Sequence, residues 1–281
     1  MKSLYFLILL ILCNPISTFS QQEGPQYTRI SKGLQGKVKE LVSTTYTIRS
    51  EGNQQQALKL YSYRYIYYPD GFIDSSFSAH LYDSLKWQFN YHYYWNGDTL
   101  CSTIHPENVW SKALFNKSQL PVYHRFFSEK SYVQHIETYF EYDTMGRPVR
   151  ISGKNDPPGK GVQYQYKKNP DGLFTQTRTD QPGPDYKVFN SKRQMIRQVY
   201  FNDAKTGKTE RQFFYNEQGD LITEKEMMYK KEGEKWVPIS KDGTTKTYRY
   251  VYDQQNNWIS METTYNRKAF ELEKRIISYW D

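Results

Sequence analysis

The sequence predicts an all-β protein, an antiparallel meander of about eight hairpin repeats that forms a large twisted, curled or spiral sheet. Two observations predict it. Aromatic and polar residues alternate at period two, so that Tyr61, Tyr63 and Tyr65 share one strand face opposite Ser62 and Arg64. A turn-forming unit also recurs about every 25 residues. Because strand twist accumulates, a flat sheet of about sixteen strands is not expected; the sheet should curl, wind into a spiral or close.

Each repeat unit is an alternating aromatic run, an Asp or Asn, two or three turn residues, a Gly, and a second alternating run. The clearest copies span residues 65–71, 140–146, 213–219 and 250–256. Successive units are 21 to 27 residues apart, except for a last step of 37 that contains an insertion around residues 238–245. Glycine and asparagine suit the positive φ of a hairpin tip. The predicted turn positions are, in chain order, Gly71, Gly97, Gln119, Gly146, Gly172, Arg193, Gly219 and Asn256.

The first 20 residues have the organisation of a secretory signal peptide. Lys2 supplies the positive start, and residues 4–12 form an apolar run that is too short to span a membrane. Thr18 and Ser20 are small residues at positions −3 and −1 of a cleavage site. The alternative is a lipoprotein signal at Cys13, but the residue before this cysteine is a bulky leucine, where lipidation normally needs a small residue.

Residues 21–281 are predicted to form a single β-repeat domain, because the repeat spacing continues across the Pro- and Gly-rich segments. An outer-membrane barrel is an alternative. It needs lipid-facing aliphatic residues over about 9–11 residues per strand. The expected strands are shorter and carry tyrosine or charge on both faces, so the chain is not expected to span the membrane after signal cleavage.

Removing the signal peptide leaves a basic chain, with 37 − 30 = +7 charges over 281 − 20 = 261 residues. Basic charge with interleaved aromatic residues would favour single-stranded nucleic acid in a cytoplasmic protein, but export argues against that partner. Acidic glycans, anionic headgroups or a mildly basic surface without a ligand remain open. Cys101 would be the one thiol left, so it cannot form an internal disulfide and is expected to be a small buried residue.

The repeat units resemble YD repeats, the Tyr-Asp-x-x-Gly hairpins of RHS-type bacterial surface proteins. The closest matches are residues 142–147 and 215–221. Both ends of the chain are similar to a group of secreted bacterial proteins with degenerate copies of this repeat, through residues 34–38, 253–258 and 273–279. Asn256 stands where those proteins have glycine, a replacement that the left-handed conformation tolerates. The resemblance implies a scaffold associated with the cell envelope and carries over no catalytic residue.

The sequence contains no recognisable catalytic or metal-binding motif, so we expect no enzyme activity, cofactor or metal site. The five histidines (His80, His92, His105, His124 and His135) do not form a metal-ligand spacing, and nucleophile-elbow, P-loop and dinucleotide motifs are missing. Glu224 and Glu226 fall on one strand face, which suits a solvated surface better than the opposed carboxylates of a glycosidase.

The leading hypothesis is an exported, non-catalytic β-repeat scaffold or binding protein of the periplasm or cell surface. Its expected partners are an envelope polysaccharide or another envelope protein. The alternatives are a glycan-active hydrolase and an accessory component of an RHS-like toxin system. Aromatic residues that depart from the repeat are the candidate ligand contacts, because loop-borne rings can stack on sugars. They are Trp87, Tyr93, Tyr94, Trp95 and Trp110. The competing interpretation is that they fill a gap between poorly matched repeats.

Overall fold

The computed structural model describes residues 34–281 with short gaps, and its strands form one antiparallel sheet. The gaps are residues 52–53, 81–87, 97–98, 105–108, 117–119, 129–134, 158, 181–184, 203 and 267. The predicted signal peptide (residues 1–20) lies outside the described residues. The first strands are β1 (Val38–Glu51), β2 (Gln54–Tyr67), β3 (Ile73–His80), β4 (Gln88–Asn96), β5 (Thr99–Ile104), β6 (Val109–Phe115), β7 (Pro121–Ser128), β8 (His135–Tyr142), β9 (Pro148–Gly153) and β10 (Val162–Lys168). The remaining strands are β11 (Phe174–Arg178), β12 (Tyr186–Phe189), β13 (Met195–Phe201), β14 (Gly207–Tyr215), β15 (Leu221–Glu232), β16 (Lys235–Pro238), β17 (Thr244–Tyr252), β18 (Trp258–Tyr265) and β19 (Lys268–Tyr279). Within these ranges, no helix is long and apolar enough to cross a membrane.

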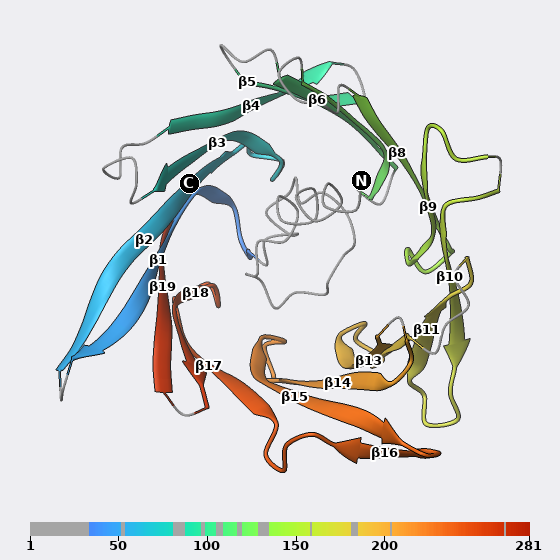
Figure 1. The fold of residues 1–281 in the computed structure, drawn as a ribbon. Coiled ribbons are helices and arrows are strands. Elements are labelled where there is room, and N and C mark those ends of the chain that lie inside the picture. The colour runs from blue at the N-terminus through green and yellow to red at the C-terminus, as the bar shows by residue number, and fades with distance from the viewer. Residues whose placement is uncertain are drawn as a thin grey trace.

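The sheet closes on itself into a barrel, as the ring of strands in Figure 1 shows. From β1 to β15 each strand pairs with its successor, β15 pairs with both β16 and β17, and β1 pairs with both β2 and β19. With β16 outside the ring, 19 − 1 = 18 of the described strands complete the circle. The closing pair runs from Val38 opposite Tyr279 to Thr47 opposite Glu271. The expectation of an open twisted, curled or spiral sheet is therefore wrong.

The sheet closes because its hairpins bend repeatedly at one end. Successive strands are antiparallel, so the connections that follow β2, β4, β6, β8, β10, β12, β14 and β17 all lie at the same end, here called the turn rim. In six of these described hairpins the register shifts just before the turn, for example between Ile66 and Tyr67 and between Phe214 and Tyr215. A bulge bends its strand and increases the local twist. Repeated at the same rim, the bulges curl the sheet until its two edges pair.

The turns of this rim share one hydrogen-bonding pattern. In the turn from Asp143 to Arg147, Asp143 N donates to Arg147 O at 2.9 Å and Gly146 N donates to Asp143 O at 2.9 Å. The side-chain atom Asp143 Oδ1 accepts from Arg147 N at 2.9 Å. This is a type I turn followed by a left-handed residue. The side-chain oxygen of the first turn residue accepts from the backbone N–H four residues later in four other turns, which begin at Asn116, Asn190, Asn216 and Asp253.

The left-handed turn position coincides with the glycines of the repeat. The values of φ at the turn positions are 93° at Gly71, 73° at Gly146, 83° at Gly172, 63° at Arg193, 95° at Gly219 and 59° at Asn256. Gly97 and Gln119 lie outside the described residues. One turn with the same hydrogen bonds lies at the opposite rim, and the repeat pattern did not predict it. There Asn202 Oδ1 accepts from Thr206 N at 2.8 Å, and Lys205 has a φ of 54°.

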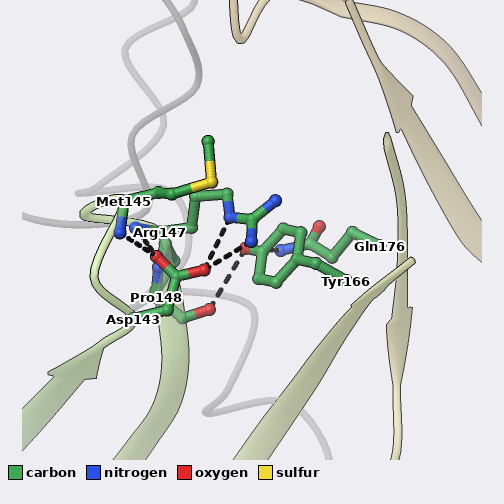
Figure 2. Close-up of polar contacts among 6 residues, drawn as sticks. All are labelled: Asp143, Met145, Arg147, Pro148, Tyr166 and Gln176. Carbon is green, nitrogen blue, oxygen red and sulfur yellow. Dashed lines mark hydrogen bonds and ion pairs between the residues drawn. The ribbon is translucent and has the colours of Figure 1, made fainter. Parts of the chain in front are cut away.

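Tyrosine hydroxyls connect each of several repeats to the strand before it. Tyr166, at the end of β10, donates to the carbonyl oxygen of Pro148, the first residue of β9, at 3.1 Å (Figure 2). Buried Gln176 donates to the same hydroxyl at 2.6 Å, and the guanidinium of Arg147 lies 4.4 Å from the Tyr166 ring centroid while pairing with Asp143. The equivalent bonds join Tyr142 to Pro121, Tyr215 to Met195 and Tyr250 to Leu221. Four tyrosines therefore hold their strand to the strand that precedes it.

The tyrosine face of β2 points into the ring. The segment that precedes β1 turns inward in Figure 1, and its Leu34 packs with Leu41, Tyr67 and Ile73 in a buried cluster. Strand registers carry this inner face around the barrel, since Tyr65 lies opposite Leu41 and Leu41 opposite Ile277. The opposite, outer face carries charged residues on neighbouring strands, including Arg64, Arg125, Glu141, Lys167, Lys225, Arg249 and Lys274.

A set of four polar residues fastens the closure at the turn rim. The side chain of Asn257 is 1% exposed, and its Oδ1 accepts from Gln35 N at 2.6 Å. Its Nδ2 donates to Gln35 O at 3.0 Å and to the Tyr279 hydroxyl at 2.7 Å, and that hydroxyl donates to Asp253 Oδ2. The last repeat turn therefore binds both the segment before β1 and the end of β19. Gln35, Asp253, Asn257 and Tyr279 are called the closure cluster below.

We predict that Gly219→Val destabilises the protein by about 1–3 kcal/mol, because a β-branched residue is strained at positive φ. Gly219→Asn should cost less, since asparagine tolerates this conformation. Gly153→Val is a matched control, because Gly153 ends β9 and is not among the glycines with positive φ. Urea unfolding monitored by circular dichroism would measure the three variants. Equal losses for Gly219→Val and Gly153→Val would contradict the role assigned to the turn.

Candidate functional site

An aromatic ladder lines the inner face of β2 and β3. The ring centroids of Tyr61 and Tyr63 are 5.5 Å apart, and those of Tyr63 and Tyr65 are 6.3 Å apart with nearly parallel planes. His80 lies 6.3 Å from the Tyr61 ring and 6.2 Å from the Tyr63 ring. The ladder follows from strand geometry, because residues i and i+2 point to one face. Tyr61 and Tyr63 are half-buried, so their rings retain some accessible surface.

Strand β19 carries a buried ion pair close to the ladder. Glu273 is 1% exposed and Arg275 is 7% exposed, with Arg275 Nε 3.4 Å from Glu273 Oε1. Ser43 Oγ donates to the same carboxylate oxygen at 2.5 Å, and the Arg275 guanidinium lies 3.2 Å from the Trp258 ring centroid. Burial lowers the pKa of Arg275, and the nearby Glu273 opposes that shift. This pair joins β19 to β1 and β18, so it belongs to the closure of the barrel.

Burial makes the phenols of Tyr61 and Tyr65 weaker acids than a free tyrosine. It raises the pKa of Tyr65 to about 12, with a further contribution from the charge of Glu273. Burial also raises the pKa of Tyr61, and the carboxylates of Glu271 and Glu273 add to that shift. Neutral phenols beside carboxylates can donate hydrogen bonds and present flat rings, which is the chemistry of polar recognition rather than of nucleophilic attack.

Three more acidic side chains lie on the inner face. The Tyr248 hydroxyl donates to Glu224 Oε2 at 3.2 Å. Arg211 Nε lies 2.6 Å from Glu226 Oε2 and 3.8 Å from Glu224 Oε1, so this pair of acids shares an arginine. Burial and the neighbouring Glu273 raise the pKa of Glu271, while Lys246 opposes the shift.

A pocket of about 470 Å³ lies where β17, β18 and β19 meet, at the rim opposite the turn rim. It is lined by Lys246, Tyr265, Lys268 and Phe270. Its size is within the range of small-ligand sites, about 300–1,000 Å³. The site on the inner face therefore has three parts: the aromatic ladder, the acidic residues beside it, and this basic pocket at the rim.

The structure does not bring the predicted ligand contacts onto one surface. Tyr93 is half-buried on the inner face, where it packs against two core clusters. Tyr94 lies on the outer face, is 38% exposed and stacks on His92 with ring centroids 6.1 Å apart. Strand alternation separates these neighbours. Trp95 lies opposite Leu100, and Trp110 opposite Thr103, in the strand registers. Trp87 lies outside the described residues.

Sequence reasoning missed the ladder as a site, although it identified Tyr61, Tyr63 and Tyr65 as one face of a strand. It also missed Glu273 and Arg275, because charged residues at i and i+2 in a strand are typical of a solvated face. Cys101 is 3% exposed and forms part of the core. Among the described residues, no group of three or more His, Cys, Asp or Glu side chains is arranged to hold a metal ion.

No family model matches the chain, and no curated protein matches it in sequence. Among solved structures, the chain is similar to a porin-like protein from Bacteroides uniformis ATCC 8492, at 8% identity and a TM-score of 0.35, with 87% of this chain and 98% of that chain covered. It is also similar to a porin-like protein from Bacteroides vulgatus ATCC 8482, at 11% identity and a TM-score of 0.27, covering 86% and 98%. A chain of the TcdB2-TccC3-Cdc42 complex matches at 10% identity and a TM-score of 0.25, and 76% of this chain spans 15% of that one. None of these likenesses is close enough to assign a function.

We predict that Arg275→Met destabilises the protein by about 3–5 kcal/mol, because it leaves the Glu273 carboxylate buried without its counter-charge. The double variant Glu273→Gln with Arg275→Met should be more stable than this single variant, since it also removes the buried charge. Lys274→Met, one residue away and exposed on the outer face, is the control and should change stability by less than about 0.5 kcal/mol. Thermal unfolding would measure all three. A double variant less stable than Arg275→Met would argue against the pairing.

Proposed function

We propose that the protein is an exported, non-catalytic β-repeat scaffold of the bacterial cell envelope that binds a glycan on the inner face of its barrel. The observation that carries the proposal is the ladder of Tyr61, Tyr63 and Tyr65 with His80 beside it. Flat aromatic rings stack on the apolar faces of sugars, and phenols and carboxylates at their edges can bond sugar hydroxyls. The predicted signal peptide supports export.

Rigidity favours this surface over an exposed loop as a binding site. The ladder lies on a strand that is paired on both sides, by β1 over twelve residue pairs and by β3 over seven. The rings therefore lose little conformational freedom when a ligand binds, which lowers the entropic cost of association. The ladder also spans several residues along one strand, about 3.3 Å per residue, so it suits an extended chain of sugars.

The alternative function of a glycan hydrolase has less support from the arrangement of the acids. Glu224 on β15 and Glu271 on β19 are separated by three strand spacings, about 14 Å at about 4.8 Å each. Paired glycosidase carboxyls lie about 5–9.5 Å apart. Glu226 is held by Arg211, and Glu273 is buried with Ser43 and Arg275. An accessory role in an RHS-like toxin system would rest on the repeat resemblance alone.

We expect the purified protein to bind at least one envelope polysaccharide fragment in isothermal titration calorimetry. Tyr61→Ala and Tyr63→Ala should each weaken that binding at least tenfold, about 1.4 kcal/mol. The matched control is Tyr139→Ala. Tyr139 forms a ring pair with Tyr123 at 5.2 Å and is 42% exposed, but lies on the outer face. Circular dichroism would establish that the variants are folded. Equal affinity of Tyr61→Ala and Tyr139→Ala would contradict binding at the ladder, and a panel without any bound glycan would contradict the function.

A further inference from the structure

The pocket at the rim between β17, β18 and β19 has a composition different from that of the ladder. Two of its four lining residues are lysines, Lys246 and Lys268, and the other two are aromatic, Tyr265 and Phe270. The aromatic rings are 6.2 Å apart and nearly perpendicular. No lining residue is acidic. Two carboxylates lie close to Lys246: Glu224 is its partner in the β15–β17 register, and Glu271 interacts with it electrostatically, although burial still raises the pKa of Glu271.

The strand registers fix the positions of the pocket residues. Lys246 lies opposite Tyr265 in the pairing of β17 with β18, and Tyr265 lies opposite Lys268 in the pairing of β18 with β19. Three side chains from three strands therefore form one row across the inner face. The β18–β19 register shifts between Thr263 and Thr264, which leaves Phe270 as the extra residue of a bulge.

The turn beside the pocket is held by two reciprocal hydrogen bonds. Asn266 N donates to Thr245 O at 2.8 Å, and Thr245 N donates to Asn266 Oδ1 at 2.9 Å. Asn266 has a φ of 46°, the left-handed conformation that asparagine tolerates. These bonds tie the start of β17 to the connection between β18 and β19. They therefore fix the backbone on either side, from which Lys246 and Tyr265 project.

Two ammonium groups beside two rings select a ligand that has both a negative charge and an apolar ring face. Lysine is a point charge with three donors, which suits a carboxylate. A neutral sugar would contact the rings but bring no negative charge to the two lysines. Inorganic phosphate would satisfy the lysines but offer nothing to Tyr265, which is 41% exposed. A sugar ring that carries a carboxylate meets both requirements.

We infer that this pocket binds a uronic acid residue of an acidic glycan, with the carboxylate on Lys246 and Lys268 and the sugar face on Tyr265. The inference rests on the proposed function and specifies its ligand class. The ladder then binds the neutral part of the glycan, and the pocket gives preference for acidic chains. Because the contacts are between charges at a rim, affinity for the acidic chain falls as salt concentration rises.

The test is calorimetric titration of the full protein with oligogalacturonate, with a neutral oligosaccharide of equal length, and with inorganic phosphate. Oligogalacturonate should bind at least tenfold more tightly than the neutral chain, and phosphate should bind more weakly than both. Lys268→Gln and Lys246→Gln should each abolish most of that difference between the acidic and the neutral chain. The matched controls are Lys225→Gln and Lys274→Gln, which are exposed on the outer face and should change neither affinity.

The outcomes separate this inference from the proposed function. If the neutral chain binds and Tyr61→Ala abolishes its binding, but oligogalacturonate has no advantage, the inference about the pocket fails and the proposed function stands. If oligogalacturonate binding depends on Lys268 and Tyr61→Ala has no effect on either chain, the ladder is excluded and the pocket stands. Phosphate that binds as tightly as oligogalacturonate would overturn the assignment to a sugar. The absence of binding by both chains would overturn both proposals.

Discussion

At the turn rim one interaction recurs from hairpin to hairpin: the side-chain oxygen of an Asp or Asn accepts the backbone N–H groups on the far side of the turn. In the turn that Asp143 begins, this oxygen accepts from both Met145 N and Arg147 N. The chain can then reverse only if the fourth turn residue is left-handed, and the strand before it gains a bulge in six of the described hairpins. The bend that results has the same sense at each repeat. In most of these turns a short polar side chain at the first position thus supports the curvature that leads to closure; the β2–β3 turn has Tyr68 at that position and still carries the bulge.

The repeats depend on one another because four tyrosine hydroxyls donate to carbonyl oxygens of the strand before their own. Tyr166 donates to Pro148 and Tyr215 to Met195, so a repeat in isolation would lose these hydrogen bonds between repeats. An open array would have this cost at its two ends, where terminal repeats need caps. Closure removes the ends. Within the closure cluster, Asn257 donates both to Tyr279 of the last strand and to Gln35 of the segment before β1. The first and last parts of the barrel therefore cap each other.

Much of the local structure could be predicted from the sequence, and the global arrangement could not. The turns at Gly146 and Gly219 could be predicted because few residues other than glycine or asparagine suit positive φ. The shared face of Tyr61 and Tyr63 could be predicted because a period of two residues defines a strand. Closure of the barrel could not be predicted. It requires β1 to pair with β19, and pairing between distant segments leaves no periodic pattern in the sequence. The strand β16, which lies outside the ring and ends where the insertion around residues 238–245 begins, was not predicted. The ion pair of Glu273 and Arg275 was missed for the same reason as closure, because its burial exists only once the two edges meet.

The central claim is that the two edge strands pair, and a disulfide across the seam tests it directly. In a chain without its native cysteines (Cys13→Ser, Cys101→Ser), Val42→Cys with Ile276→Cys places two thiols at paired positions of β1 and β19. Thr44→Cys with Ser62→Cys does the same within the β1–β2 hairpin and serves as the positive control. Directly paired residues in an antiparallel sheet have Cα atoms about 4.5–5.5 Å apart, within the range that a disulfide spans. The closed barrel predicts that mild oxidation forms both disulfides, each detected by mass spectrometry. A disulfide in the hairpin pair without one between residues 42 and 276 would show that the sheet is open.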